Sequence, residues 1–251
     1  MSFLDAPPLA FAHRGGAAAG DENTAEAFGR AVALGYRYLE TDVHATADGV
    51  PVVLHDPDLA RVSGNAGLVA RLRWADLTTV RVGGAAAVPR LDDVLAAWPR
   101  IRFNIDVKAD AAAGPAVAAV QRAGAGDRVL LASFDDARLT RLRALAGPRV
   151  ASSLGRRAVA RLRAASLAGL RFRPAAGVVA AQVPVRHGRL RVVDGRLLAC
   201  AHRAGLQVHV WTIDDPEEMC RLLDLGVDGI MTDRIETLRD VFAERDLWPP
   251  H

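Results

Sequence analysis

Short apolar runs rich in β-branched residues alternate with alanine-, leucine- and arginine-rich stretches of helical periodicity along the whole chain. The pattern predicts strands at residues 9–12, 38–44, 52–54, 102–107, 129–132, 149–152, 178–181, 207–211 and 229–231. It predicts helices at residues 25–34, 91–97, 115–123, 137–146 and 216–225. Strands that alternate with helices in this way are typical of βαβ units around a parallel sheet.

Two of the helix starts carry recognisable capping signals. Residues 23–26, with Asn23 and Glu26 at their ends, have the pattern of a capping box. Asp215 and Pro216, followed by two glutamates, combine an N-cap with proline at the first helical position and acids in the first turn. These signals support helices that begin directly after strands or short loops.

The nine predicted strands are one more than an eight-stranded barrel requires. Strand 52–54 follows the dipeptide Asp48-Gly49, which favours a hairpin turn, so we expect it to pair back on strand 38–44. The 251 residues then suit one α/β domain spanning 1–251, a single TIM-type (β/α)8 barrel with a short hairpin strand after its second strand. A doubly wound open sheet is the alternative. Segment 56–88 is too short for a large inserted cap domain.

Polar side chains lie where several of these strands end, and barrel enzymes place their active sites at that end. Side chains alternate between the two faces of a strand. Glu40 and Asp42 therefore share one face of their strand, and Asn104, Asp106 and Lys108 share one face of another. If the intervening apolar residues pack against the helices, both polar sets point into the mouth of the barrel.

The three carboxylates in these two sets would repel one another without a counter-charge between them. A hard divalent cation with oxygen ligands, Mg²⁺ or Ca²⁺, would supply that charge. The alternative is that the acids form structural salt bridges with Arg14, Arg102 or Lys108. Two same-face sets at strand ends favour the metal site.

Arginine provides almost all the positive charge of this chain, which makes Lys108 unusual. It is the only lysine, against 31 arginines. Lysine offers a compact, flexible point charge where arginine is a broad planar fork, so its place beside Asp106 indicates a role in the site. The arginines are scattered among acids and alanines without interleaved aromatic residues. The net charge of +3 therefore does not indicate nucleic-acid binding.

His13 and His55 are the candidates for acid–base catalysis, because imidazole titrates near neutral pH and each of them ends a strand. His13 is followed by Arg14 and a glycine pair, which leaves room for an anion to approach the backbone. His55 is followed by an acid. The other histidines are expected at surface or capping positions: His44, His187, His202, His209 and His251.

The length of the apolar runs and the first eight residues bear on where in the cell the protein is located. No apolar run approaches the roughly 20 residues of a transmembrane helix. Residues 1–8 lack the basic and apolar regions of a secretory signal. We therefore expect a cytoplasmic protein without a transmembrane segment, whose oligomeric state the sequence does not indicate.

The motifs of the chain resemble, in order and spacing, the signature of the glycerophosphodiester phosphodiesterase family. The first set is HRGG at 13–16, ENT at 22–24, ETDV at 40–43, TADG at 46–49 and HD at 55–56. Later blocks are PRL at 89–91, NIDVK at 104–108, SF at 133–134, WTID at 211–214 and GVDGIMTD at 226–233. The resemblance covers nearly the whole chain. It implies a TIM-type barrel, one divalent metal ion, and hydrolysis of glycerophosphodiesters to glycerol 3-phosphate and an alcohol.

The resemblance also implies roles for individual residues. The metal ligands would be Glu40, Asp42 and Asp106, and the general acid and base would be His13 and His55. Substrate and phosphate would be bound by Arg14, Lys108 and Trp211, with support from Glu22, Asn23 and Asn104. Two positions depart from the family, which usually has glutamate at position 106 and often asparagine at position 214.

Two other functions are compatible with the same barrel. A lysophospholipase D acting on lyso-lipids would need an apolar groove for an acyl chain, and segment 167–185 could line one, although buried strand and helix is the simpler interpretation. A non-catalytic phosphate-binding barrel would have lost at least one acid–base or metal position, and this chain has lost none.

Overall fold

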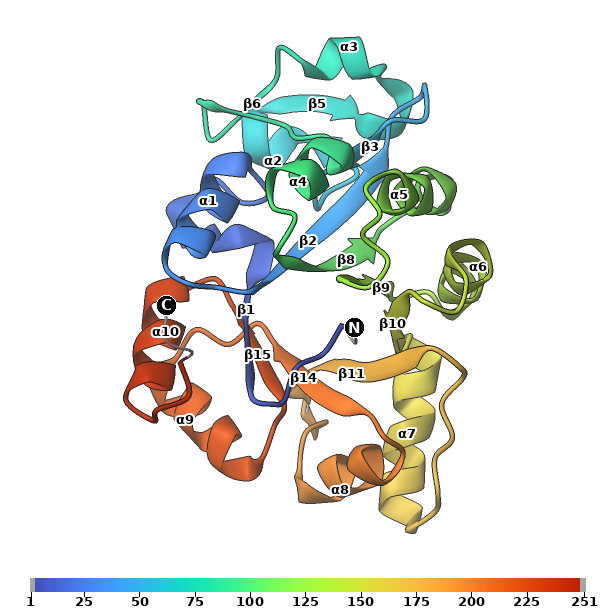
Figure 1. Cartoon of the computed structure of the whole chain (residues 1–251), viewed down its shortest axis with the longest axis vertical. Helices are drawn as coiled ribbons and strands as arrows, with labels where there is room; N and C mark the ends of the chain where they lie inside the picture. The colour runs from blue at the N-terminus through green and yellow to red at the C-terminus, as the bar shows by residue number, and fades with distance from the viewer. Residues whose placement is uncertain (1–2, 249–251) are drawn as a thin grey trace.

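The computed structural model describes residues 3–248, and its centre is a closed barrel of parallel strands (Figure 1). β1 pairs with β15 on one side and with β2 on the other, so the sheet closes. The predicted barrel is confirmed and the open sheet is wrong. In chain order the barrel strands are β1 (Leu9–Ala12), β2 (Tyr38–Ala45), β8 (Arg102–Val107), β9 (Val129–Ala132), β10 (Ala151–Ser153), β11 (Val178–Pro184), β14 (Gln207–Trp211) and β15 (Gly229–Thr232).

A helix follows each barrel strand, and Figure 1 shows these helices as a ring around the sheet. Their apolar faces pack on the outward-facing strand residues in one large core. They are α1 (Ala25–Ala33), α4 (Leu91–Ala97), α5 (Asp110–Arg122), α6 (Asp136–Ala146), α7 (Arg156–Ala168), α8 (Gly195–Arg203), α9 (Pro216–Leu225) and α10 (Ile235–Ala243). Because the strands are parallel, their carboxyl ends and the loops into these helices all meet at one end of the barrel.

One helix starts several residues earlier than the sequence predicts, and another starts where expected but has a different cap. α5 begins at Asp110 and carries Pro115 in its interior, whereas the prediction placed that proline at the start. The three alanines before it are strong helix formers and extend the helix by more than a turn. At α1 the N-cap is Thr24, whose hydroxyl accepts from Ala27 N at 3.2 Å. The predicted capping box is therefore wrong, because Asn23 turns into the barrel instead.

The predicted hairpin strand is confirmed as β3 (Pro51–Val53), which pairs antiparallel to β2 with Val53 opposite Val43. Between β3 and α4 the chain forms a small lobe. Its elements are β4 (Asp58–Leu59), α2 (Ala60–Ser63), β5 (Asn65–Leu68), η3 (Val69–Arg71), α3 (Trp74–Leu77), β6 (Arg81–Val82) and β7 (Ala86–Ala87). The lobe lies at the top of Figure 1 and has an apolar cluster of its own, which includes Leu59 and Leu77.

The interior of the barrel is apolar below the carboxyl ends of its strands. Phe11, Tyr38, Leu130 and Met231 fill it from four strands. His209 lies there too, fully buried, with its ring 4.8 Å from that of Phe11. Its expected place at the surface is therefore wrong: it shares the inward face of β14 with Trp211, two residues on. Burial lowers the pKa of His209 to about 3, so its ring is neutral.

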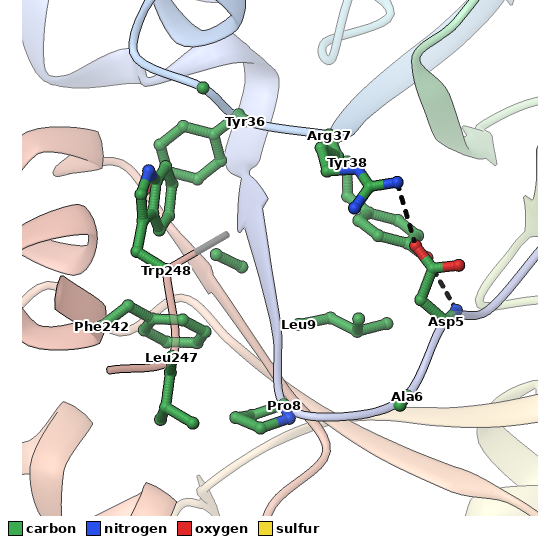
Figure 2. A pocket seen from close by; sticks show the side chains of 12 residues that line it. Asp5, Ala6, Pro8, Leu9, Tyr36, Arg37, Tyr38, Phe242, Leu247 and Trp248 are labelled. Carbon is green, nitrogen blue, oxygen red and sulfur yellow. Dashed lines mark hydrogen bonds and ion pairs between the residues drawn. The ribbon is translucent and has the colours of Figure 1, made fainter. Parts of the chain in front are cut away.

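The amino-terminal end of the barrel carries a cavity of about 140 Å³, remote from the carboxyl ends of the strands (Figure 2). Tyr36 and Trp248 line one side and Asp5 the other, where the Tyr38 hydroxyl accepts from Asp5 N at 2.9 Å.

Among the described residues, none of the helices has the length and apolar character needed to span a bilayer.

Candidate active site

The loop after β1 turns sharply at the mouth of the barrel. His13, Arg14 and Gly15 form a single 3-10 turn, and Arg14 takes a left-handed conformation with φ of 52°. Gly15 has φ of 82°, and a Cβ there would lie 2.8 Å from the ring of Phe28 on α1. Only glycine permits this approach. The turn aims Arg14 N at Glu40, with a hydrogen bond of 3.2 Å to Oε2.

His13 is held by a carboxylate that the sequence did not single out. Its Nδ1 lies 2.7 Å from Asp233 Oδ1, just after β15, and its Nε2 lies 3.8 Å from Glu40 Oε2. Burial works against the charged imidazole, but Glu40 and Asp233 outweigh it and raise the pKa of His13. Because the acceptor is a carboxylate, Nδ1 carries a proton and Nε2 faces the site.

His55 has a matching arrangement on the other side of the mouth. Its Nδ1 lies 2.6 Å from Asp56 Oδ1. The ring of His44 on β2 is buried beneath it and donates from Nε2 to the backbone carbonyl of His55 at 3.1 Å. His44, expected at the surface or at a cap, thus supports the loop that carries His55.

The carboxylates of β2 and β8 meet as the register predicts, since Asp42 pairs with Asp106 and Glu40 with Asn104. Lys108 lies between two of them, with Nζ 2.7 Å from Asp42 Oδ1 and 2.6 Å from Asp106 Oδ2. Burial opposes its charge, but both carboxylates raise the pKa of Lys108. Its ammonium is therefore a fixed positive charge at the centre of the cluster.

The environments of the three carboxylates differ. Burial is opposed at Asp42 by Lys108 and Arg14, which together lower the pKa of Asp42. At Asp106 burial prevails and raises the pKa. Burial and the neighbouring Asp42 raise the pKa of Glu40 to about 7. The buried cluster thus has more carboxylates than its cations neutralise.

Arg14 and Glu22 extend the cluster towards the small lobe. Arg14 Nε lies 3.1 Å from Asp42 Oδ2, and its Nη1 lies 3.0 Å from Glu22 Oε1. Arg61, on α2 of the lobe, binds both oxygens of Glu22 at 2.7 Å and also Asp56 Oδ2 at 2.6 Å. A single guanidinium therefore ties the lobe to the carboxylates beside Arg14 and His55.

The N-cap of α1 is Thr24 and not the expected Asn23, because the Asn23 side chain makes contacts inside the site instead. Its φ is 60°, and its amide donates to Asp42 Oδ2 at 2.9 Å while accepting from Thr41 Oγ1 at 2.7 Å. The side chain thus orients a carboxylate of the site. Asn104 is buried as well, and its Oδ1 has no hydrogen-bond partner among the described residues.

Trp211 borders the mouth at the end of β14. Its ring meets the ring of Phe134 edge to face at 5.6 Å, and Phe134 lies 5.8 Å from Lys108 Nζ. An aromatic wall thus stands beside the charged cluster. In the segment considered for an acyl-chain groove, residues 167–185, Leu167 and Leu170 lie at the carboxyl end of α7, which runs away from the mouth, whereas β11 ends at the mouth. The groove stays a prediction.

No group of three or more His, Cys, Asp or Glu side chains is gathered closely enough to hold a metal ion as the side chains stand in residues 3–248. Lys108 and Arg14 occupy the space between the carboxylates instead. The donor set nevertheless fits a hard dication, since Glu40, Asp42, Asp106 and the unpartnered Asn104 Oδ1 are all oxygen donors.

The structure therefore brings together almost every residue expected in the site. Sequence reasoning missed three that support it: Asp233, Arg61 and His44. Asp233 follows the last strand, a place that predicts site residues in a barrel. Asp214 fixes it, since Asp214 Oδ1 accepts from Thr232 Oγ1 and from Asp233 N. An asparagine oxygen could accept the same two bonds, which explains why the departure at position 214 is tolerated.

We expect Arg61→Gln to lower kcat about tenfold, or ~1.4 kcal/mol, because Glu22 and Asp56 would lose their shared partner. Arg71→Gln, an exposed arginine of the same lobe, is the matched control. Steady-state kinetics of both variants, with melting curves, checks the prediction. A fall in kcat with unchanged Tm supports a positioning role for Arg61, and parallel kinetics in the two variants contradicts it.

Comparisons with known proteins agree with this geometry. Residues 13–237 match the model of the glycerophosphoryl diester phosphodiesterase family. A Mycobacterium tuberculosis protein named "Probable glycerophosphodiester phosphodiesterase 2" is 43% identical over 244 residues, which cover 96% of this chain and 92% of that protein.

Solved structures share the fold. A candidate glycerophosphoryl diester phosphodiesterase from Silicibacter pomeroyi superposes with a TM-score of 0.78 at 26% identity, covering 98% of this chain and 97% of the other. A phosphodiesterase of Oleispira antarctica, in complex with its product sn-glycerol-3-phosphate, gives 0.78 at 21% identity, covering 94% and 97%. That second likeness shows the barrel alone. The family match over most of the chain and the close relative show that this chain is an enzyme belonging to the glycerophosphoryl diester phosphodiesterase family.

Proposed function

We propose that His13 and His55 are the general acid and base of a glycerophosphodiester hydrolysis that proceeds through an internal attack. One observation carries this assignment: both imidazoles bind a carboxylate through Nδ1, Asp233 for His13 and Asp56 for His55. Each pair fixes the ring and its tautomer and leaves Nε2 free to exchange a proton with substrate.

The reaction uses the two histidines in sequence. One imidazole takes the proton of the glycerol 2-hydroxyl, whose oxygen attacks the phosphorus. The bond to the alcohol oxygen breaks, and the other imidazole protonates the departing alcohol. Water then opens the cyclic phosphate with the roles reversed, which yields glycerol 3-phosphate. The attack is intramolecular and gains from proximity.

We further propose that Glu40, Asp42 and Asp106 hold one divalent cation, Mg²⁺ or Ca²⁺, with Asn104 beside them. The bound ion would offset negative charge on the phosphoryl oxygens. Lys108 must then release one of its two carboxylates, which frees its ammonium to bind the phosphate. Arg14 can bind the phosphate from the β1 side. Glu22 holds the Arg14 guanidinium in place, and Asn23 holds Asp42.

The experiment that tests this function is a substrate panel. Purified protein is incubated with glycerophosphocholine, glycerophosphoethanolamine, glycerophosphoglycerol and a lysophosphatidylcholine, each with Mg²⁺, Ca²⁺ or Mn²⁺. Release of glycerol 3-phosphate from the deacylated substrates supports the proposal. Turnover of the lyso-lipid alone would assign a lysophospholipase D activity, and no turnover of any phosphodiester would favour a binding barrel.

Lys108→Arg is expected to lower kcat/KM at least tenfold, or ~1.4 kcal/mol, although the charge is kept. The lysine Nζ fits between Asp42 and Asp106 at 2.7 and 2.6 Å, and the broader guanidinium cannot take the same place. Kinetics of the purified variant, with its circular dichroism spectrum, provides the check. Unchanged kcat/KM would mean that the one lysine of the chain has no special role.

A further inference from the structure

Basic residues are scattered along the chain, but its net positive charge comes from one segment in which they are not matched by acids. Residues 156–196 contain ten arginines and a single acid, Asp194, which leaves the rest of the chain with more acidic than basic residues. Arg163 binds Asp194 with both guanidinium nitrogens at 2.8 Å and is largely buried. The one acid of the segment is therefore already paired, and the segment has no other carboxylate to neutralise its remaining arginines.

Half of these arginines lie at the carboxyl ends of neighbouring barrel strands, beside the mouth of the active site. Arg156 and Arg157 begin α7 after β10. After β11 the chain forms a small hairpin of β12 (Arg186–His187) and β13 (Leu190–Arg191). We name Arg156, Arg157, Arg186, Arg189, Leu190 and Arg191 the basic rim, and all six are exposed.

The hairpin of the basic rim sets like charges against each other. Arg186 pairs directly with Arg191 across its two strands, an arrangement that destabilises an isolated antiparallel pair. Within residues 3–248, neither arginine forms an ion pair, and nor does Arg189 at the turn between them. The charge of Arg191 helps to lower the pKa of Glu218 on α9, but the Glu218 carboxylate forms its ion pair with Arg221. The hairpin thus presents uncompensated positive charge.

Apolar side chains stand among these charges. Leu190 is 55% exposed between Arg189 and Arg191, and Phe134, which follows β9, is 47% exposed. Arg156 lies over the Phe134 ring at 5.7 Å. The hairpin does not stand alone, because Arg163 donates to the carbonyl of Arg191 at 3.3 Å and so holds it against α7. A fixed basic surface with apolar tips suits the interface of a bilayer.

We propose that the basic rim docks this enzyme on an anionic lipid surface, with the mouth of the barrel facing the headgroups. Arginines near a negatively charged leaflet gain attraction that falls off within a Debye length, while Leu190 and Phe134 enter the interfacial layer. Charge complementarity excludes a second copy of the rim as the partner. The exposed leucine at the hairpin favours lipid over nucleic acid, whose phosphates offer no apolar layer.

The test is co-sedimentation with vesicles, which needs no turnover and is therefore independent of the proposed reaction. Vesicles of equal parts phosphatidylglycerol and phosphatidylcholine are compared with pure phosphatidylcholine at low and at physiological salt. The variant is Arg186→Glu with Arg189→Glu. The matched control is Arg171→Glu with Arg173→Glu, which changes the charge equally in the loop between α7 and β11, at the opposite end of the barrel.

The unmodified enzyme is expected to bind the anionic vesicles, to release them as salt rises, and to ignore pure phosphatidylcholine. The partition coefficient of the hairpin variant should fall at least about tenfold. That of the control should fall by less than about threefold. Leu190→Ser should weaken binding without changing its salt dependence. Equal losses in the two charge variants, no binding to anionic vesicles, or hairpin-dependent binding to duplex DNA instead would overturn the proposal.

Discussion

Replacing either His13 or His55 by alanine is expected to lower kcat for a glycerophosphodiester by about 10²–10⁴-fold. In the proposed reaction each imidazole would move one proton in each half, so its removal would leave each half without its acid or its base. The loss should fall on kcat more than on KM, because the charged groups around the phosphate remain.

His187→Ala is the matched control, since His187 is an exposed residue of the small hairpin and takes part in none of the contacts described for the site. Steady-state kinetics on a soluble substrate checks the three variants together. Asp233→Asn should lose less than His13→Ala, because the amide keeps contact with the ring but no longer stabilises its charged form. Near-normal kcat in His13→Ala or His55→Ala would remove that histidine from the chemistry.

Chelation followed by desalting is expected to abolish turnover, and Mg²⁺ or Ca²⁺ should restore it. The physical reason is the excess of buried carboxylates, which Lys108 and Arg14 offset only in part. Glu40→Gln removes one donor and one negative charge, so it should weaken metal binding while the barrel stays folded.

Two measurements separate the metal site from a purely structural ion-pair cluster. The first is activity as a function of free metal after chelation. The second is the rise of Tm with added Mg²⁺ or Ca²⁺, which reports binding without catalysis. Full activity in excess chelator, with no metal-dependent rise in Tm, would assign the carboxylates to salt bridges with Lys108 and Arg14.

The barrel and the polar faces of β2 and β8 could be predicted because they follow from the two-residue period of strands. Glu40 and Asp42 point inward together, and Asp106 faces Asp42 in register. The same period also puts His209 on the inward face of β14 with Trp211, against the expectation of a surface or capping position. Its ring is tolerated inside because Gln207 Oε1 lies 3.0 Å from Nε2 and the ring is neutral.

Other parts of the site depend on contacts between segments far apart in sequence. Asp233 reaches His13 only because β15 pairs with β1, 220 residues away. Arg61 reaches Glu22 only because the small lobe folds back over the loop after β1. Asn23 looked like a cap because local sequence matches one, and its bond to Asp42 is a tertiary contact. Periodicity carries no information about such pairings.

The most direct test of the two-histidine account uses an analogue of glycerophosphocholine whose glycerol 2-hydroxyl is replaced by hydrogen. Without that hydroxyl there is no internal nucleophile, so the analogue should inhibit competitively and release no choline at a measurable rate. Glycerophosphocholine itself, assayed alongside, should release choline and glycerol 3-phosphate. Cleavage of the deoxy analogue at a comparable rate would contradict the internal attack and assign the reaction to direct attack by water.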